Sequence, residues 1–244
     1  MLRKTIFFFL LLFLAMGAFA QTGEESLRRM YNAHTGKWYK GFTFVQQTEF
    51  YRNDSLQRTA VWYEAARFPH DLRIDMEDPK NGNAVIYRKD STYRFQRGQL
   101  TRVTAGTNPF TFILGGMYMQ PFDTVKAYLQ QDGYDLSKGY TTSWQGRKTY
   151  VIGALAGDTS SKQMWVDAEN LYLVRTMEIT RGSHMDARMS GQTRVGNGWS
   201  ETRVEFYFDG KLRQLEKYSE LRPDDHIDER IFDPAWFGKI HWKQ

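Results

Sequence analysis

The residue types that most often carry out catalysis are sparse in this chain and poorly placed for it. There are five histidines, His34, His70, His184, His226 and His241, and there is no cysteine. No two histidines stand four residues apart, and the chain has no G-x-S-x-G, Walker-type or G-x-G-x-x-G motif. The sequence therefore predicts no metal site, no cofactor and no enzymatic activity.

Two polar segments deserve comparison with catalytic or cation sites. Residues 224–229 (DDHIDE) combine four carboxylates with His226, which could hold a weak cation or serve an exported hydrolase through Asp225 and His226. Charge runs usually face solvent, so we favour a solvated surface segment and keep the hydrolase as an alternative. Residues 157–160 (GDTS) lie between two predicted strands, which favours a hairpin turn over a nucleophile turn.

The most distinctive stretch is apolar. Residues 108–121 (NPFTFILGGMYMQP), the insert, interrupt a chain whose apolar and polar residues otherwise alternate with period two. Its apolar side chains could form the lid of a cavity: Phe110, Phe112, Ile113, Leu114, Met117 and Met119. Gly115-Gly116 and the bracketing prolines favour a movable element. Buried helices are also apolar all round, so the insert could equally be a fixed part of the core.

The first twenty residues read as a targeting segment. Arg3 and Lys4 precede a short apolar run that ends in the small-residue pattern at 18–20, which is typical of a cleavable secretory signal peptide. Residues 21–244 then form one predicted domain, a length that suits a single β domain. The whole chain has 33 basic and 28 acidic residues, and the leader holds two of the basic ones, so the remainder has a formal charge of +3. Nothing in this modest, scattered charge indicates nucleic-acid binding.

The alternation predicts a mainly β (α+β) fold with about a dozen short strands. Tight turns such as 53–55 and Asp209-Gly210 join them, which indicates one large antiparallel meander, curved or partly closed. A capping-box pattern at Thr22 and Glu25 predicts a helix over 23–34, and apolar spacing predicts a second over 122–131. Residues 181–185 (RGSHM) are expected to form a loop.

Four blocks of the chain occur in a telling order: G-F-x-F-x-Q at 41–46, residues 62–74, M-W-V-D at 164–167 followed by 171–175, and I-F-D-P at 231–234. Together they resemble the LolA-like family of periplasmic lipoprotein carriers. The first block is similar to the family's opening strand, and the second resembles a hairpin, with Pro69 and Arg73 on matching positions. The third block resembles a later strand pair, and the fourth resembles the terminal segment. Ala168 and His70 depart from the family pattern, and the segment after Arg181 is longer.

The resemblance implies a large curved antiparallel sheet, a half-barrel, with helices covering its open apolar face. It also implies that the concave face binds acyl chains of lipoproteins for transfer to the outer membrane. We expect Phe42, Phe44, Trp62 and Ile74 to line that face, with the insert folded over it. Arg73 is the residue that the resemblance suggests as a polar tether for the lid or a contact for a lipid head group. Because strand parity decides which side chains face inward, an error of one position would move the lining residues outside.

The expected partners are an acylated lipoprotein or another lipid, together with donor and acceptor proteins of the inner and outer membranes. We expect a periplasmic, monomeric protein. A lipid-sensing regulatory module on the same fold remains an alternative to carriage.

Overall fold

The structure, a computed structural model, describes residues 22–243. Its helices are α1 (Gly23–His34), α2 (Pro109–Ile113) and α3 (Phe122–Gln131), with 3-10 helices η1 (Pro79–Asn81), η2 (Gly116–Met119), η3 (Glu229–Phe232) and η4 (Pro234–Trp236). The first strands are β1 (Gly41–Arg52), β2 (Ser55–Arg67), β3 (Asp71–Met76), β4 (Ala84–Arg88), β5 (Ser91–Gln96) and β6 (Gln99–Ala105). The later strands are β7 (Asp135–Trp144), β8 (Arg147–Gly153), β9 (Gln163–Asp167), β10 (Leu173–Thr180), β11 (Ser183–Ser190), β12 (Thr193–Val195), β13 (Gly198–Ser200), β14 (Arg203–Phe208) and β15 (Lys211–Pro223).

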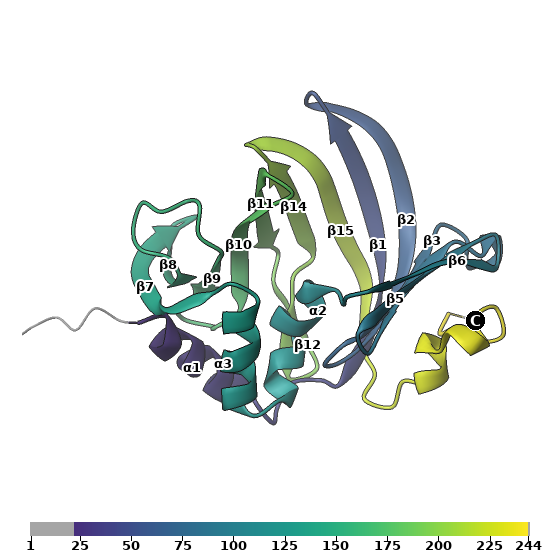
Figure 1. The fold of residues 1–244 in the computed structure, drawn as a ribbon, viewed down its shortest axis with the longest axis horizontal. Coiled ribbons are helices and arrows are strands. Elements are labelled where there is room, and N and C mark those ends of the chain that lie inside the picture. The colour runs from purple at the N-terminus through teal and green to yellow at the C-terminus, as the bar shows by residue number, and fades with distance from the viewer. Residues whose placement is uncertain (1–21, 244) are drawn as a thin grey trace, which may run out of the picture.

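One large antiparallel sheet dominates the molecule and is strongly curved (Figure 1). Its thirteen strands run in the order β6-β5-β4-β3-β2-β1-β15-β14-β11-β10-β9-β8-β7, and β12 and β13 form a separate pair. The sheet is open, with β6 and β7 at its two edges. The predicted mainly β half-barrel is therefore confirmed.

The chain path differs from the expected simple meander. The chain starts at the middle of the sheet with β1, builds outward to β6, and then restarts at the opposite edge with β7 before returning to pair β15 with β1. Residues 106–134, which include the insert and α3, make the connection from one edge to the other (Figure 1). This connection places the insert across the open side of the half-barrel.

Most predicted strand positions match the structure, and three segments differ. Strands predicted over 187–195 and 199–209 are each split, into β11 and β12 and into β13 and β14. At the first break Gly191 has a φ of +67°, and its carbonyl accepts a hydrogen bond from the Thr202 hydroxyl at 3.0 Å. The expected loop over 181–185 is wrong in part, because only Arg181 and Gly182 form a turn and Ser183 already begins β11.

The helices pack against the sheet as the capping and periodicity predict. Thr22 and Glu25 form both bonds of the capping box at the start of α1. Leu27 and Met30 of α1 and Val125 and Leu129 of α3 are fully buried in the main apolar core. No helix among residues 22–243 is long and apolar enough to cross a membrane. The predicted leader, residues 1–20, lies outside the described residues.

A second apolar cluster lies on the other face of the sheet, under the C-terminal segment 224–243. Ile227, Ile231 and Phe232 of this segment pack against Ala65, Ala84, Ile86 and Phe95 of β2, β4 and β5. Figure 1 shows this segment on the convex side of the half-barrel, beside β3, β5 and β6. The C-terminal segment therefore covers the convex face of strands β2 to β5.

Candidate functional site

A cavity of about 270 Å³ lies on the concave side of the sheet. Side chains of one parity from β1, β2, β3, β14 and β15 form its wall, and the insert closes one side. The lining residues are Phe42, Phe44, Gln46, Trp62, Glu64, Ala66, Phe68, Leu72, Ile74, Tyr87, Asn108, Phe110, Thr111, Leu114, Met189, Glu201, Val204, Phe206, Glu216 and Tyr218. Two larger hollows, of about 630 and 880 Å³, are lined by many more charged side chains and suit an apolar ligand less well.

Aromatic rings make up much of the cavity wall. The ring of Phe44 stacks on that of Phe42 at 4.9 Å between centroids and meets Tyr218 at the same separation. From the insert, Phe110 meets Phe206 edge-on at 5.8 Å. Such rings offer large apolar area and also a negatively polarised face. The wall can therefore hold a hydrocarbon chain or a cation that sits over a ring.

Six of the ten apolar residues proposed from the sequence line this cavity: Phe42, Phe44, Trp62, Ile74, Phe110 and Leu114. The other four belong to the insert and lie elsewhere. Phe112 and Met117 are buried in the main core, where the Phe112 ring lies 3.9 Å from that of Tyr128. Ile113 is also in that core, and Met119 lines the hollow beside His70. The insert thus contributes to both the core and the cavity wall.

The second half of the insert is firmly anchored. Tyr118 is buried, its ring packs against those of His34 and Trp38, and its carbonyl accepts a hydrogen bond from the Thr35 hydroxyl at 3.2 Å. The Tyr31 hydroxyl likewise donates to the carbonyl of Gln120 at 2.8 Å. These contacts fix η2 and the residue after it to α1 and to the loop that follows α1.

The two glycines of the insert have a packing role. A Cβ at Gly115 would collide with the Phe68 ring, and a Cβ at Gly116 would collide with the carbonyl oxygen of Pro69. Neither glycine has a φ in the left-handed region. The need for a small residue at these two close contacts therefore explains both glycines, and no hinge role is required.

We expect Gly116→Ala to lower the free energy of unfolding by about 1–3 kcal/mol, because the methyl group meets backbone atoms that cannot yield cheaply. Denaturant titration of wild type and variant measures this. If the glycine served only as a flexible hinge, alanine would instead stabilise the fold by about 0.4–1 kcal/mol. Such a gain would contradict the packing role.

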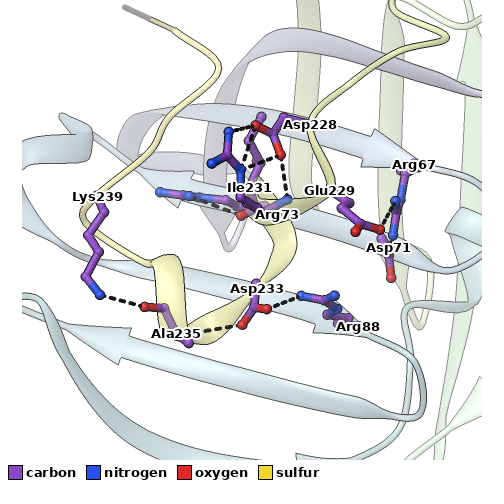
Figure 2. Close-up of polar contacts among 11 residues, drawn as sticks. Arg67, Asp71, Arg73, Arg88, Asp228, Glu229, Ile231, Asp233, Ala235 and Lys239 are labelled. Atoms are coloured by element: carbon purple, nitrogen blue, oxygen red, sulfur yellow. Dashed lines mark hydrogen bonds and ion pairs between the residues drawn. The ribbon is translucent and has the colours of Figure 1, made fainter.

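Arg73 does not line the cavity, and its side chain lies beside Ile231 of the C-terminal segment (Figure 2). Its neighbours Leu72 and Ile74 face the cavity, and alternation along β3 turns Arg73 away from it. Its guanidinium donates two hydrogen bonds to Asp75, at 2.7 and 2.9 Å, and others to the carbonyls of Ile231 and Ile240, at 3.2 and 3.0 Å. The expected lid tether is therefore corrected: Arg73 fastens the C-terminal segment to the convex face.

We expect Arg73→Lys to lower the free energy of unfolding by about 2 kcal/mol, since lysine cannot donate to the carboxylate of Asp75 and both carbonyls at once. Proteolysis within residues 224–243 should become faster in the variant, while uptake of a ligand into the cavity should not change. Reduced uptake with unaltered stability would instead support a role at the cavity.

The acidic segment 224–229 has structural partners for its carboxylates. Asp225 accepts a hydrogen bond from the backbone N–H of Lys40 at 2.7 Å, and Glu229 forms an ion pair with Arg67 at 3.0 Å. Asp228 pairs with Arg230 and caps η3. Within residues 22–243, no group of three His, Cys, Asp or Glu side chains is arranged to hold a metal ion.

Sequence reasoning missed three glutamates of the cavity wall, Glu64, Glu201 and Glu216, which are 5%, 7% and 7% exposed. Burial raises the pKa of Glu64 well above its usual value, and the nearby Glu216 raises it further. Burial also raises the pKa of Glu201 to about 7, and it raises that of Glu216 despite hydrogen bonds from Tyr218 and Gln214. Glu64 could have been identified from the sequence, because it has the same strand parity as Ala66 and as Trp62, which was expected to line the cavity.

No protein-family model matches this chain, and no curated protein matches it. Among solved structures, a DUF1329 family protein from Desulfovibrio piger is similar, with a TM-score of 0.62 and 15% identity over 88% of this chain and 97% of that one. An outer membrane lipoprotein-sorting protein domain from Vibrio parahaemolyticus has a TM-score of 0.60 and 10% identity over 88% and 97%. A LolA superfamily protein from Nitrosomonas europaea has a TM-score of 0.54 and 12% identity over 86% and 97%. At these identities the likeness concerns the fold, and the chain has a LolA-like fold.

Proposed function

We propose that this protein is a periplasmic carrier that binds acyl chains, those of a lipoprotein or another acylated lipid, and releases them at the outer membrane. The observation that supports this most is the aromatic-walled cavity on the concave face, with Phe110 and Leu114 of the insert on its wall. Two of the structural neighbours are described as a LolA superfamily protein and a lipoprotein-sorting domain, and they share the fold. Transfer rather than catalysis is the proposed activity.

The energetics of transfer set a requirement that such a cavity can meet. Each methylene of an acyl chain that leaves water contributes about 0.8 kcal/mol. A carrier must offer apolar area comparable to the membrane's, and no more, or the cargo would never be released. The cavity volume of about 270 Å³ lies just below the range of about 300–1,000 Å³ typical of small-molecule pockets. Binding of several chains at once would therefore require the insert to move outward.

The cellular setting belongs to the same proposal. The predicted leader over 1–20 would export the chain to the periplasm, where donor and acceptor proteins of the two membranes would load and unload it. We propose that the protein works as a monomer.

Native mass spectrometry and organic extraction of the purified mature protein test this function directly. We expect bound acylated species, or saturable uptake of a fluorescent acyl probe by the ligand-free protein. A protein that purifies empty and takes up no acyl probe would contradict carriage. Stable co-purification with a membrane regulator, in place of lipid cargo, would favour the sensory alternative.

A further inference from the structure

The cavity wall is acidic as well as apolar. Three glutamates, Glu64 from β2, Glu216 from β15 and Glu201 from the link between β13 and β14, line it among the aromatic rings. No lysine, arginine or histidine is among the lining residues. A pocket shaped only for hydrocarbon needs no carboxyl groups, and a pocket for an anionic head group would place basic side chains there.

The three carboxyl groups differ in how far the protein satisfies them. Glu216 accepts hydrogen bonds from the Tyr218 hydroxyl and, at 2.6 Å, from the Gln214 amide. The Glu64 carboxyl has no hydrogen-bond or ion-pair partner among residues 22–243, although it is 95% buried and lines the cavity. A buried polar group without a partner is costly. A ligand that donates a hydrogen bond could thus supply the partner that the Glu64 carboxyl lacks.

The groups also lie close enough to influence one another. Glu216 acts on the carboxyls of Glu64 and Glu201, and all three glutamates act on the Tyr218 phenol, whose pKa burial raises well above its usual value. Tyr218 therefore lies within electrostatic reach of all three carboxyl groups, and the Phe44 ring lies 4.9 Å from its own. Tyr87 is the other titratable side chain on the cavity wall. A positive charge placed here would meet several acceptors and the faces of aromatic rings together.

We propose that the cavity selects amphiphiles whose head group is a protonated amine, with the ammonium group bound between the Glu64 carboxylate and the neighbouring aromatic rings. This inference rests on the proposed function, because the alkyl chain of the ligand would occupy the same apolar wall. A carboxyl that holds a proton in the empty cavity releases it to solvent when the ammonium arrives. The ammonium then donates a charge-assisted hydrogen bond to that carboxylate.

Displacement of a fluorescent neutral alkyl probe by decylamine, decan-1-ol and decanoate tests the proposal at matched chain length. At pH 7 an alkylamine is protonated, as lysine is. We expect decylamine to displace the probe at a roughly tenfold lower concentration than decan-1-ol, since a hydrogen bond to a charged group exceeds one between neutral groups. Decanoate should be the weakest of the three.

Substitutions test whether the Glu64 carboxylate itself binds the ammonium group or whether the overall negative charge of the protein causes the preference. Glu64→Gln keeps the shape of the side chain and should bring decylamine to within about twofold of decan-1-ol, because the amide is not a charged acceptor. Glu201→Gln should reduce the preference in the same direction. Glu205→Gln is the matched control and should leave the preference intact, because Glu205 pairs with Arg203 at 2.6 Å and does not line the cavity.

The possible outcomes distinguish the two proposals. If the neutral probe itself does not bind, the acyl-binding function fails, and the amine preference fails with it. If the probe binds and the three competitors displace it equally, carriage stands and the amine preference is overturned. If Glu64→Gln folds and still prefers decylamine tenfold, Glu64 is not the acceptor and the proposal is overturned.

Discussion

Phe112→Asp is expected to lower the free energy of unfolding by about 4 kcal/mol or more, while Leu114→Asp is expected to fold and to lose ligand uptake. The two residues are two positions apart in the insert but have different surroundings. Phe112 is 2% exposed and packs against Tyr128 in the main core. Truncating a buried phenylalanine costs about 3–5 kcal/mol, and a buried carboxylate adds a desolvation cost.

Leu114 is only partly buried and lines the cavity, so an aspartate there can keep contact with solvent while it places a charge beside the ligand. We expect affinity for a neutral alkyl probe to fall about tenfold or more, because the probe loses apolar contact and the cavity gains a charge. Gln120→Asp adds the same charge to the insert at a residue that does not line the cavity, and it should bind normally. Thermal denaturation and probe titration of the three variants measure both quantities.

This pair of variants decides between the two interpretations of the insert. If both substitutions unfold the protein, the whole insert is core. If Phe112→Asp folds and only loses uptake, Phe112 belongs to a lid that moves away from Tyr128.

The contribution of Glu201 to the free energy of unfolding is expected to fall as the pH rises from about 4.5 to about 7. The pKa of Glu201 is raised from 4.5 to about 7 in the folded protein by burial. Below pH 4.5 the carboxyl is protonated in both states, and the stabilising contribution is complete. As the pH rises, the Glu201 carboxyl ionises first in the unfolded state. The contribution therefore decreases with pH and is fully lost once the pH exceeds the pKa of the folded state. The difference corresponds to about 3 kcal/mol for this group.

Glu201→Gln isolates this effect from other titrating groups. Carboxylates such as Asp186, whose pKa is lowered by hydrogen bonds from Arg175 and Arg188 against the opposing effect of burial, change stability in the opposite sense, but they are the same in both proteins. We therefore expect the variant and wild type to have similar stability at pH 4, and the variant to be more stable by about 3 kcal/mol at pH 8. Denaturant titrations at the two pH values test this. An equal difference at both would show that Glu201 ionises as freely in the folded state as in the unfolded one.

Local patterns were enough to predict most of the secondary structure. The capping box at Thr22 and the apolar spacing of Val125 and Leu129 are interactions within one helix, so the sequence indicates them directly. Strand alternation and turn pairs such as Asp209-Gly210 located the hairpins for the same reason. The splits near Gly191 were missed, because a contact with Thr202, in the link between β13 and β14, stabilises the break.

The insert shows the limit of composition as a guide. Its apolar content predicted burial, and Phe112 and Met117 are indeed in the core. Yet Phe110 and Leu114 of the same short segment face the cavity. Which side chain goes where depends on the edge-to-edge connection from β6 to β7, and strand patterns do not specify that path. The glycines Gly115 and Gly116, read from sequence as flexibility, are explained by contacts with Phe68 and Pro69.

By itself, the sequence determined that this chain forms antiparallel hairpins with an apolar helical insert, because those features arise between residues near one another along the chain. Only the tertiary structure decided which face of each strand borders the cavity. The C-terminal segment covers the convex side of β3, so Leu72, which lines the cavity, and Arg73, on the other face, are both buried, and period-two alternation no longer identifies the inside. That covering turned Arg73 toward Ile231 and Ile240, and the curvature of the sheet gathered Glu64, Glu201 and Glu216, far apart in sequence, around one hollow.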